Sequence, residues 1–161
     1  MESTGLGAEL ETTVDKTTRK VEIEGRIVDQ AAQMLGLERG LFIRVEMKDL
    51  AKAEEYHNQF GELSRQLTRA IAEVQPLLVT PQTKHNLEII DSDLGAWLAA
   101  HRDFWRASQA LISRLALDIL IKRGLPPGNE IQALGNEVIQ LQDAILAESL
   151  ENGRSRASRN R

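Results

Sequence analysis

Residues 53–77 read AEEYHNQFGELSRQLTRAIAEVQPL, and this stretch decides the fold class. Its apolar residues follow one another at alternating spacings of three and four, at Ala53, Tyr56, Phe60, Leu63, Leu67, Ala70, Val74 and Leu77. This pattern places one unbroken apolar stripe along an α-helix, as in helices that pack nearly parallel to one another. Because such a stripe must be buried, the segment predicts neighbouring helices.

Three more stretches have a helical pattern, and few breakers separate them. Thr80 followed by Pro81 is typical of a helix start, with the threonine as the cap. Gly124, two prolines and Gly128 predict a second break, and Asp49 is the cap expected at a third. We therefore expect helices at about 8–47, 50–76, 81–123 and 129–153. The predicted fold is all-α, an elongated antiparallel up-down-up-down four-helix bundle that forms one domain over residues 1–151, followed by a basic tail at 152–161.

The composition agrees with a helical protein of a single domain. The chain has 161 residues, of which 42% are apolar and only 4% aromatic, whereas a sandwich or barrel would be richer in aromatic and β-branched strands. There is no cysteine. This excludes disulfides, thiolate metal sites and cysteine nucleophiles.

The formal net charge is −4, and the charges are unevenly distributed. Residues 152–161 contain arginines and no acid, so the rest of the chain is more acidic than the total indicates. An acidic body argues against nucleic-acid binding. No stretch approaches the ~20 apolar residues of a membrane span, and residues 1–15 are too polar for a signal peptide. The sequence as it stands predicts a soluble chain.

The motifs of enzymes and cofactor sites are missing from the sequence. It has no glycine-rich phosphate loop and no Gly-x-Ser-x-Gly elbow. Glu54-x-x-His57 has the spacing of the metal ligands in di-iron bundles, but such a site needs a second Glu-x-x-His. Neither His85 nor His101 follows a glutamate at that spacing. We expect no catalytic residue, no metal and no cofactor.

His101 lies four residues after Trp97 and four before Trp105, on the apolar stripe of the helix expected at 81–123. One interpretation is a histidine at the edge of the core, bonded to a polar neighbour. The other is a pocket wall, in which two indoles enclose a ligand and His101 with Arg102 or Arg106 holds its acidic group. Both interpretations stay open at the level of the sequence.

Residues 94–105 read LGAWLAAHRDFW and resemble the third helix of the four-helix-bundle sensor domains of bacterial chemoreceptors and sensor kinases. Residues 37–41, LERGL, are similar to the arginine-containing segment of related sensor modules. The resemblance covers about residues 10–155. It implies an extracytoplasmic (periplasmic) ligand-sensing domain of an inner-membrane receptor, usually a homodimer, whose first and fourth helices continue into membrane spans. It also implies that ligand binding shifts the last helix slightly and biases a two-state signalling element.

The spans themselves are not in the sequence, and a complete chain without them would be cytoplasmic. The function we expect is sensing of a small molecule, such as an organic acid or amino acid, with ligand contacts at Arg39, Arg44, Trp97, His101, Arg102 and Trp105. Arginines suit such a ligand because the guanidinium forms two parallel hydrogen bonds with a carboxylate or phosphate. The alternative is a soluble helical module without a small-molecule ligand, which binds a partner protein through the apolar stripe near Leu117 and Ile121.

Overall fold

The computed structural model describes the backbone of residues 3–159 and the side chains of residues 15–154 except 142, 145, 146 and 149. Every regular element in this part is helical, so the predicted all-α class is confirmed. The elements are α1 (Ser3–Glu46), α2 (Leu50–Val74), the 3-10 helix η1 (Gln75–Leu77), α3 (Pro81–Gln109), α4 (Ser113–Ile119), the π-helical turn η2 (Leu120–Gly124) and α5 (Leu125–Arg159). Between residues 3 and 159, no helix contains a stretch long and apolar enough to span a membrane.

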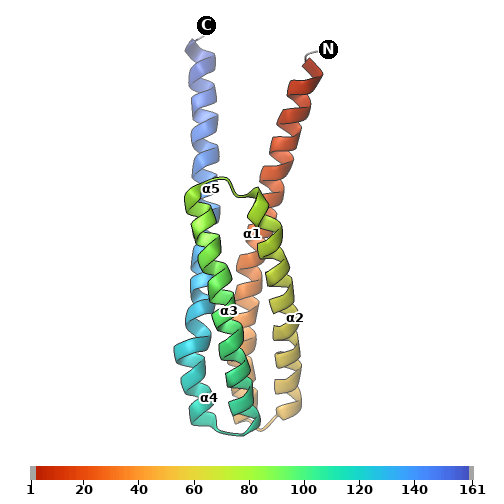
Figure 1. The fold of residues 1–161 in the computed structure, drawn as a ribbon, viewed down its shortest axis with the longest axis vertical. Coiled ribbons are helices and arrows are strands. Elements are labelled where there is room, and N and C mark those ends of the chain that lie inside the picture. Colours follow the sequence, from red (N-terminus) through yellow and green to blue (C-terminus); the bar gives the residue numbers. More distant parts are fainter. Residues whose placement is uncertain (1–2, 160–161) are drawn as a thin grey trace.

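The helices lie side by side along one long axis (Figure 1). Both chain ends lie at one end of this axis, and the turns at 47–49 and 110–112 lie at the other, which we call the distal end. α1 packs along α2 and α5, and α3 packs along α5. By contrast, the backbones of α2 and α3 come close to each other at few positions, which leaves space for large side chains between them.

Two helix starts that the sequence predicts from their caps are confirmed. Asp49 precedes α2, and its side chain accepts a hydrogen bond from the backbone N–H of Lys52 at 3.2 Å. Thr80 precedes α3, and its hydroxyl accepts a hydrogen bond from the N–H of Thr83 at 3.2 Å, with Pro81 in the first turn. These bonds satisfy N–H groups that the start of a helix leaves without partners.

The break predicted at 124–128 is wrong, and so are the bounds of the helices predicted at 81–123 and 129–153. α3 ends at Gln109, and the chain reverses at 110–112. The segment that runs back consists of α4, η2 and α5, and we call it the returning rod. It is helical through the predicted break. Pro126 and Pro127 lack N–H donors, and η2 immediately before them is the local widening that lets the helix continue. α5 reaches Arg159, so the basic tail expected at 152–161 is helical as far as the structure describes it.

Both distal turns close in the same way. Lys48 and Leu111 each have a positive φ, of 61° and 58°. In each turn, the N–H of the residue that follows bonds to the carbonyl five residues earlier, at 2.9 and 3.0 Å. This closure at a helix C-terminus usually has glycine at the position with positive φ. Because neither turn contains a glycine, the turn at 110–112 carries no conventional signal in the sequence.

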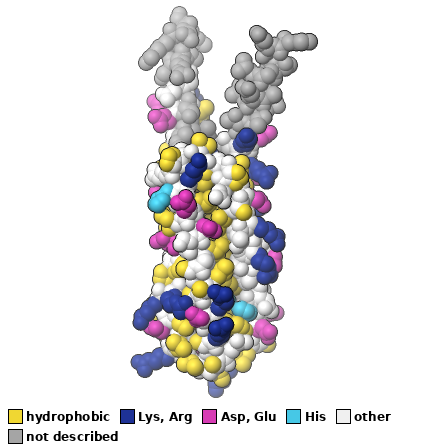
Figure 2. All heavy atoms as spheres, in the orientation of Figure 1, with side chains coloured by type: hydrophobic (Ala, Val, Ile, Leu, Met, Phe, Trp, Pro, Cys, Tyr) yellow, Lys and Arg dark blue, Asp and Glu magenta, His cyan; other side chains and the backbone are white. Residues whose placement is uncertain are grey.

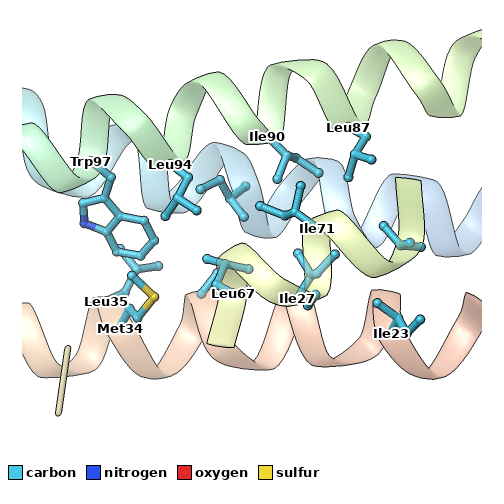
Figure 3. Close-up of a cluster of buried hydrophobic side chains, with 14 of the residues drawn as sticks. Ile23, Ile27, Met34, Leu35, Leu67, Ile71, Leu87, Ile90, Leu94 and Trp97 are labelled. Atoms are coloured by element: carbon cyan, nitrogen blue, oxygen red, sulfur yellow. The ribbon is translucent and has the colours of Figure 1, made fainter. Parts of the chain in front are cut away.

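Two clusters of buried apolar side chains fill the interior. The larger cluster lies toward the chain ends and includes Ile23, Ile27, Met34, Leu67, Ile90, Leu94, Trp97 and Ile131. Figure 3 shows part of it, with Trp97 of α3 pointing toward Leu35 and Met34 of α1. The smaller cluster lies toward the distal end and includes Leu41, Val45, Ala53, Phe104, Ala116 and Leu120.

Three polar side chains separate the two clusters, and we call them the polar layer: Glu38 of α1, His57 of α2 and His101 of α3. On α1, for example, Glu38 falls between Leu35 of the larger cluster and Leu41 of the smaller one. A polar layer across an apolar core is stable only when its members bond to one another, because each would otherwise lose its hydrogen bonds to water.

Candidate functional site

Five aromatic rings from α2 and α3 alternate along the space between these two helices, and we call this series the ring ladder. In order, the rings are Trp97, Phe60, His101, His57 and Trp105, and their successive centroid distances are 5.6, 3.7, 5.1 and 4.3 Å. The last four rings are nearly parallel, whereas Trp97 meets Phe60 edge-on at 80°. The ladder forms because α3 presents a ring every four residues and α2 presents two rings three residues apart.

A chain of hydrogen bonds crosses the ladder from the core toward the surface. Nδ1 of His101 lies 3.0 Å from Oε1 of Glu38, and Nε2 of His101 lies 2.9 Å from Nδ1 of His57. Glu38 is fully buried and His101 is 5% exposed, whereas His57 is only half-buried. The chain therefore connects a carboxylate in the core to an imidazole at the protein surface.

The hydrogen bonds restrict where the protons can be. Nδ1 of His101 donates to Glu38, because an ionised carboxylate can only accept. Nε2 of His101 and Nδ1 of His57 hold one hydrogen between them, so one of these nitrogens donates and the other accepts. When His57 is the donor, Nε2 of His101 accepts, and His57 can be a cation that carries a hydrogen on both of its nitrogens.

The second oxygen of Glu38 faces the backbone of the returning rod. A β-carbon at Gly124, the last residue of η2, would lie 3.1 Å from Oε2 of Glu38. Within the described part of the chain, this oxygen accepts no hydrogen bond. The widened turn thus brings the backbone of the returning rod against the buried carboxylate, and π-helical turns are frequent at functional sites.

A groove between α2 and α3 opens beside the ladder. Phe60, His57 and His101 line it, together with Ser64, Arg65 and Arg102. Gly61 of α2 and Gly95 of α3 also line the groove, and the missing side chains keep it open. Among the described residues that line the groove there are two arginines and two histidines but no aspartate or glutamate. Arg65 is paired with Glu62 on its own helix, at 2.8 Å, and no ion pair holds Arg102 within the described residues.

The structure places the residues predicted from the sequence in three different settings. His101, Trp105 and Arg102 lie together at the ladder or its groove. Trp97 is fully buried at the inner end of the ladder and packs in the larger cluster rather than lining the groove. Arg39 is exposed on α1, and Arg44 pairs with Asp49 at 3.6 Å near the distal end, so these two arginines do not join the groove.

Sequence reasoning missed Glu38, His57 and Phe60 as site residues, although a signal for Glu38 was present. The apolar stripe of the first helix contains Met34 and Leu41 but leaves the position between them polar, and that position is Glu38. A charged residue that fills a gap in a buried stripe has to find a partner inside the protein. His101 is bonded to a polar neighbour at the edge of the core, as the first interpretation expects, and it also lines the groove. The pocket wall of two indoles is not found there, because neither Trp97 nor Trp105 lines the groove.

Comparisons with known proteins add no identification. No protein-family model and no curated protein matches the sequence. Among the described side chains, no group of three or more histidines, cysteines and acids is arranged to hold a metal ion. The polar layer, the ring ladder and the groove are therefore the features from which we infer a function.

Proposed function

We propose that the chain is the ligand-sensing domain of a bacterial transmembrane signalling receptor, a chemoreceptor or sensor kinase. In this proposal α1, α2, α3 and the rod formed by α4, η2 and α5 are the four members of an antiparallel up-down-up-down bundle. The domain binds a small molecule and relays a displacement of one helix. Its place is extracytoplasmic, it works as a homodimer, and its first and last helices lead to membrane spans.

The observation that carries this proposal is the course of α1 and α5 at the end of the molecule opposite the distal turns. Both helices extend past the connection between α2 and α3, and they project in the same direction (Figure 1). A domain that reports ligand binding to a membrane needs two such helices, because a shift of one relative to the other is the signal. The packing of α1 along α5 gives the two helices a shared interface that such a shift would change.

The polar layer supplies a physical link from the groove to these two helices. His57 is at the groove, His101 is bonded to it, and Glu38 of α1 is bonded to His101. The carboxylate of Glu38 also lies beside Gly124, the residue immediately before α5, where a β-carbon would be 3.1 Å from Oε2. A ligand that changes the protonation or position of His57 therefore acts on a contact between α1 and the returning rod.

Two measurements test the proposal together. In a thermal-shift screen of organic acids and amino acids, a ligand at 100 times its dissociation constant stabilises the fold by about 2.7 kcal/mol. Because the chain has no cysteine, spin labels can be attached at Thr18→Cys of α1 and Glu148→Cys of α5, both exposed positions. A stabilising ligand should change the distance between these labels by about 1–2 Å. Stabilisation by a ligand without any change in this distance would argue against a relay.

A second candidate function, a helical protein-interaction module, is favoured by the distal end. Large apolar side chains are exposed there, namely Leu111, Ile112, Leu115, Leu117 and Ile121, and Figure 2 shows hydrophobic side chains gathered beside Lys and Arg at this end. Sedimentation of the wild type and of Ile121→Glu tests this function. Val79→Glu is the control, since Val79 is exposed but lies in the connection between α2 and α3. A self-associating or partner-bound species lost only in Ile121→Glu would support the module.

A further inference from the structure

We propose that the groove between α2 and α3 is the ligand site and that it binds a small organic carboxylate, held by Arg102 of α3 and by the protonated imidazole of His57 of α2. This inference rests on the proposed sensing function and names the chemistry of its ligand. Glu38 and His101 act in it as positioning residues, because they fix the ring of His57 without touching the ligand.

The hydrogen-bond chain leaves one nitrogen of His57 available. Nδ1 of His57 is bonded to His101, and the ring stacks on Trp105 with an interplanar angle of 7°. The described part of the chain offers no hydrogen-bond partner for Nε2. When His57 is protonated, its Nδ1 donates to Nε2 of His101, and its Nε2 also carries a hydrogen and can donate to a ligand. An imidazole held by a ring on one face and by a hydrogen bond on one edge is preorganised, so little freedom is lost when it binds an anion.

Two arginines line the groove, and no acid is among its described lining residues. Arg102 is exposed and has no ion pair among the described residues, and Arg65 provides a second guanidinium at the same groove. Glu62 is taken by Arg65, and Glu38 lies behind His101 in the core. An anion in the groove thus meets positive charge without a competing acid in the lining.

Protonation of His57 is coupled to the ligand in a definite direction. Burial lowers the pKa of His57 below its usual range, the neighbouring His101 lowers it further, and Glu54 one turn earlier raises it by less. From α3 the facing groups are His101 and Arg102, and Glu38 of α1 lies behind His101. A carboxylate in contact with His57 favours the charged imidazole, so binding takes up a proton and tightens as the pH falls.

The ligand class follows from these contacts together with the floor of the groove. Phe60 and the stacked imidazole of His101 give the groove an apolar base, and the cations lie around it. A small carboxylate with a short carbon skeleton matches both surfaces. Inorganic phosphate would match the cations alone, so it serves as the comparison in the test.

The test is titration calorimetry of the purified chain with succinate, malate, benzoate and inorganic phosphate at pH 5.5 and 7.5. We expect at least one carboxylate to bind, about tenfold or more tightly at pH 5.5 than at 7.5, with proton uptake seen as a dependence on the buffer. Arg102→Gln should weaken binding about tenfold at both pH values. His57→Gln should abolish the dependence on pH. The assignment is overturned if phosphate binds and no carboxylate does, or if the affinity for the carboxylate is the same at both pH values.

A pair of glycine variants fixes the location of the site. Gly95 and Gly36 are both exposed glycines within helices, and at both positions a β-carbon has nothing within 4 Å. Gly95→Leu places a side chain in the groove and should abolish binding of the carboxylate. Gly36→Leu, on α1 and outside the groove, should leave it unchanged. Because neither side chain has a clash at its β-carbon, both variants are expected to fold, which circular dichroism checks.

The outcomes separate this inference from the function on which it rests. A ligand that shifts the distance between the labels on α1 and α5, but still binds Gly95→Leu, overturns the groove and leaves sensing intact. A carboxylate that binds the groove without moving those labels supports the site and contradicts the relay. Failure of all three carboxylates to bind at pH 5.5 overturns the inference.

Discussion

The six-membered ring of Trp97 lies so close to the backbone of Gly128 that a β-carbon there would be 2.8 Å from Cζ2 and Cη2 of the indole. Cδ2 of Leu35 would be closer still to this β-carbon, at 2.7 Å. Trp97 is fully buried within the larger cluster, so its ring has no space to retreat. The returning rod approaches α3 and α1 at this level because Gly128 has no side chain.

Gly128→Ala should therefore destabilise the protein, although alanine is the better helix former. Overpacking of a filled core costs about 1–3 kcal/mol, and we expect urea unfolding to show a loss in that range. Gly36→Ala is the control, because its β-carbon has open space around it. That variant should gain about 0.5–1 kcal/mol from helix propensity. A gain at both positions would mean that the contact between α5 and Trp97 is looser than described.

Loss of the hydrogen bond between Glu38 and His101 should destabilise the protein mainly because the buried charge of Glu38 is then left without a partner. His101→Phe keeps a ring in the ladder but removes the donor to a fully buried carboxylate. Leaving a buried charge unpaired costs about 3–5 kcal/mol, which a chemical unfolding curve can resolve.

The double variant Glu38→Met with His101→Phe should recover most of this loss, because it replaces both partners with apolar side chains of similar size. Glu38→Met alone is the third corner of the cycle. If His101→Phe costs no more than Glu38→Met, and the double variant recovers nothing, the buried carboxylate does not depend on His101.

Stability should fall as the pH rises from about 4 to about 7 because of Asp93. Burial raises the pKa of Asp93 to about 7, with further contributions from a hydrogen bond to Glu130 and from the charge of Glu130. The unfolded chain titrates this group near 4. The folded state therefore holds the proton more tightly, so this contribution is present at low pH and is lost as the pH rises through the folded pKa.

Asp93→Asn tests this contribution by removing the titration while keeping the size of the side chain. The free energy of unfolding of this variant relative to the wild type should rise between pH 5 and pH 8, by an amount on the order of 1 kcal/mol because Asp93 is partly exposed to solvent. Asp91→Asn, at an exposed neighbouring position, is the control. A difference that does not depend on pH would show that Asp93 is ionised throughout.

The sequence predicted those parts of the fold in which a local signal coincides with the structure. The apolar stripe of residues 53–77, the cap at Asp49 and the cap at Thr80 were sufficient to place α2 and the start of α3. The predicted return of the chain was misplaced because Pro126 and Pro127 are strong local indicators of a helix break. In the structure the wider turn η2 precedes them, and the helix continues. Whether a proline pair breaks a helix is decided by the packing of the whole rod, which a local pattern does not contain.

The candidate site was predictable to a smaller extent, for a related reason. The spacing of Trp97, His101 and Trp105 on one helix face follows from the period of the helix. Their partners His57 and Glu38 come from other helices, and the alignment of these helices along the axis depends on the distal turns. Without the correct turn at 110–112, no sequence pattern could place Gly124 beside Glu38.

That turn yields the last prediction, since Leu111 holds a positive φ of 58° and its side chain is 60% exposed. A leucine in this conformation costs roughly 1 kcal/mol relative to glycine, and little packing offsets it. Leu111→Gly should therefore raise the free energy of unfolding by about 0.5–1 kcal/mol, measured in urea. Leu115→Gly is the matched control, because this exposed leucine lies within α4 and its loss of helix propensity should cost about 1 kcal/mol. If both variants destabilise equally, the side chain of Leu111 makes a contact that outweighs its backbone strain, and the exposed distal end is where that contact must be sought.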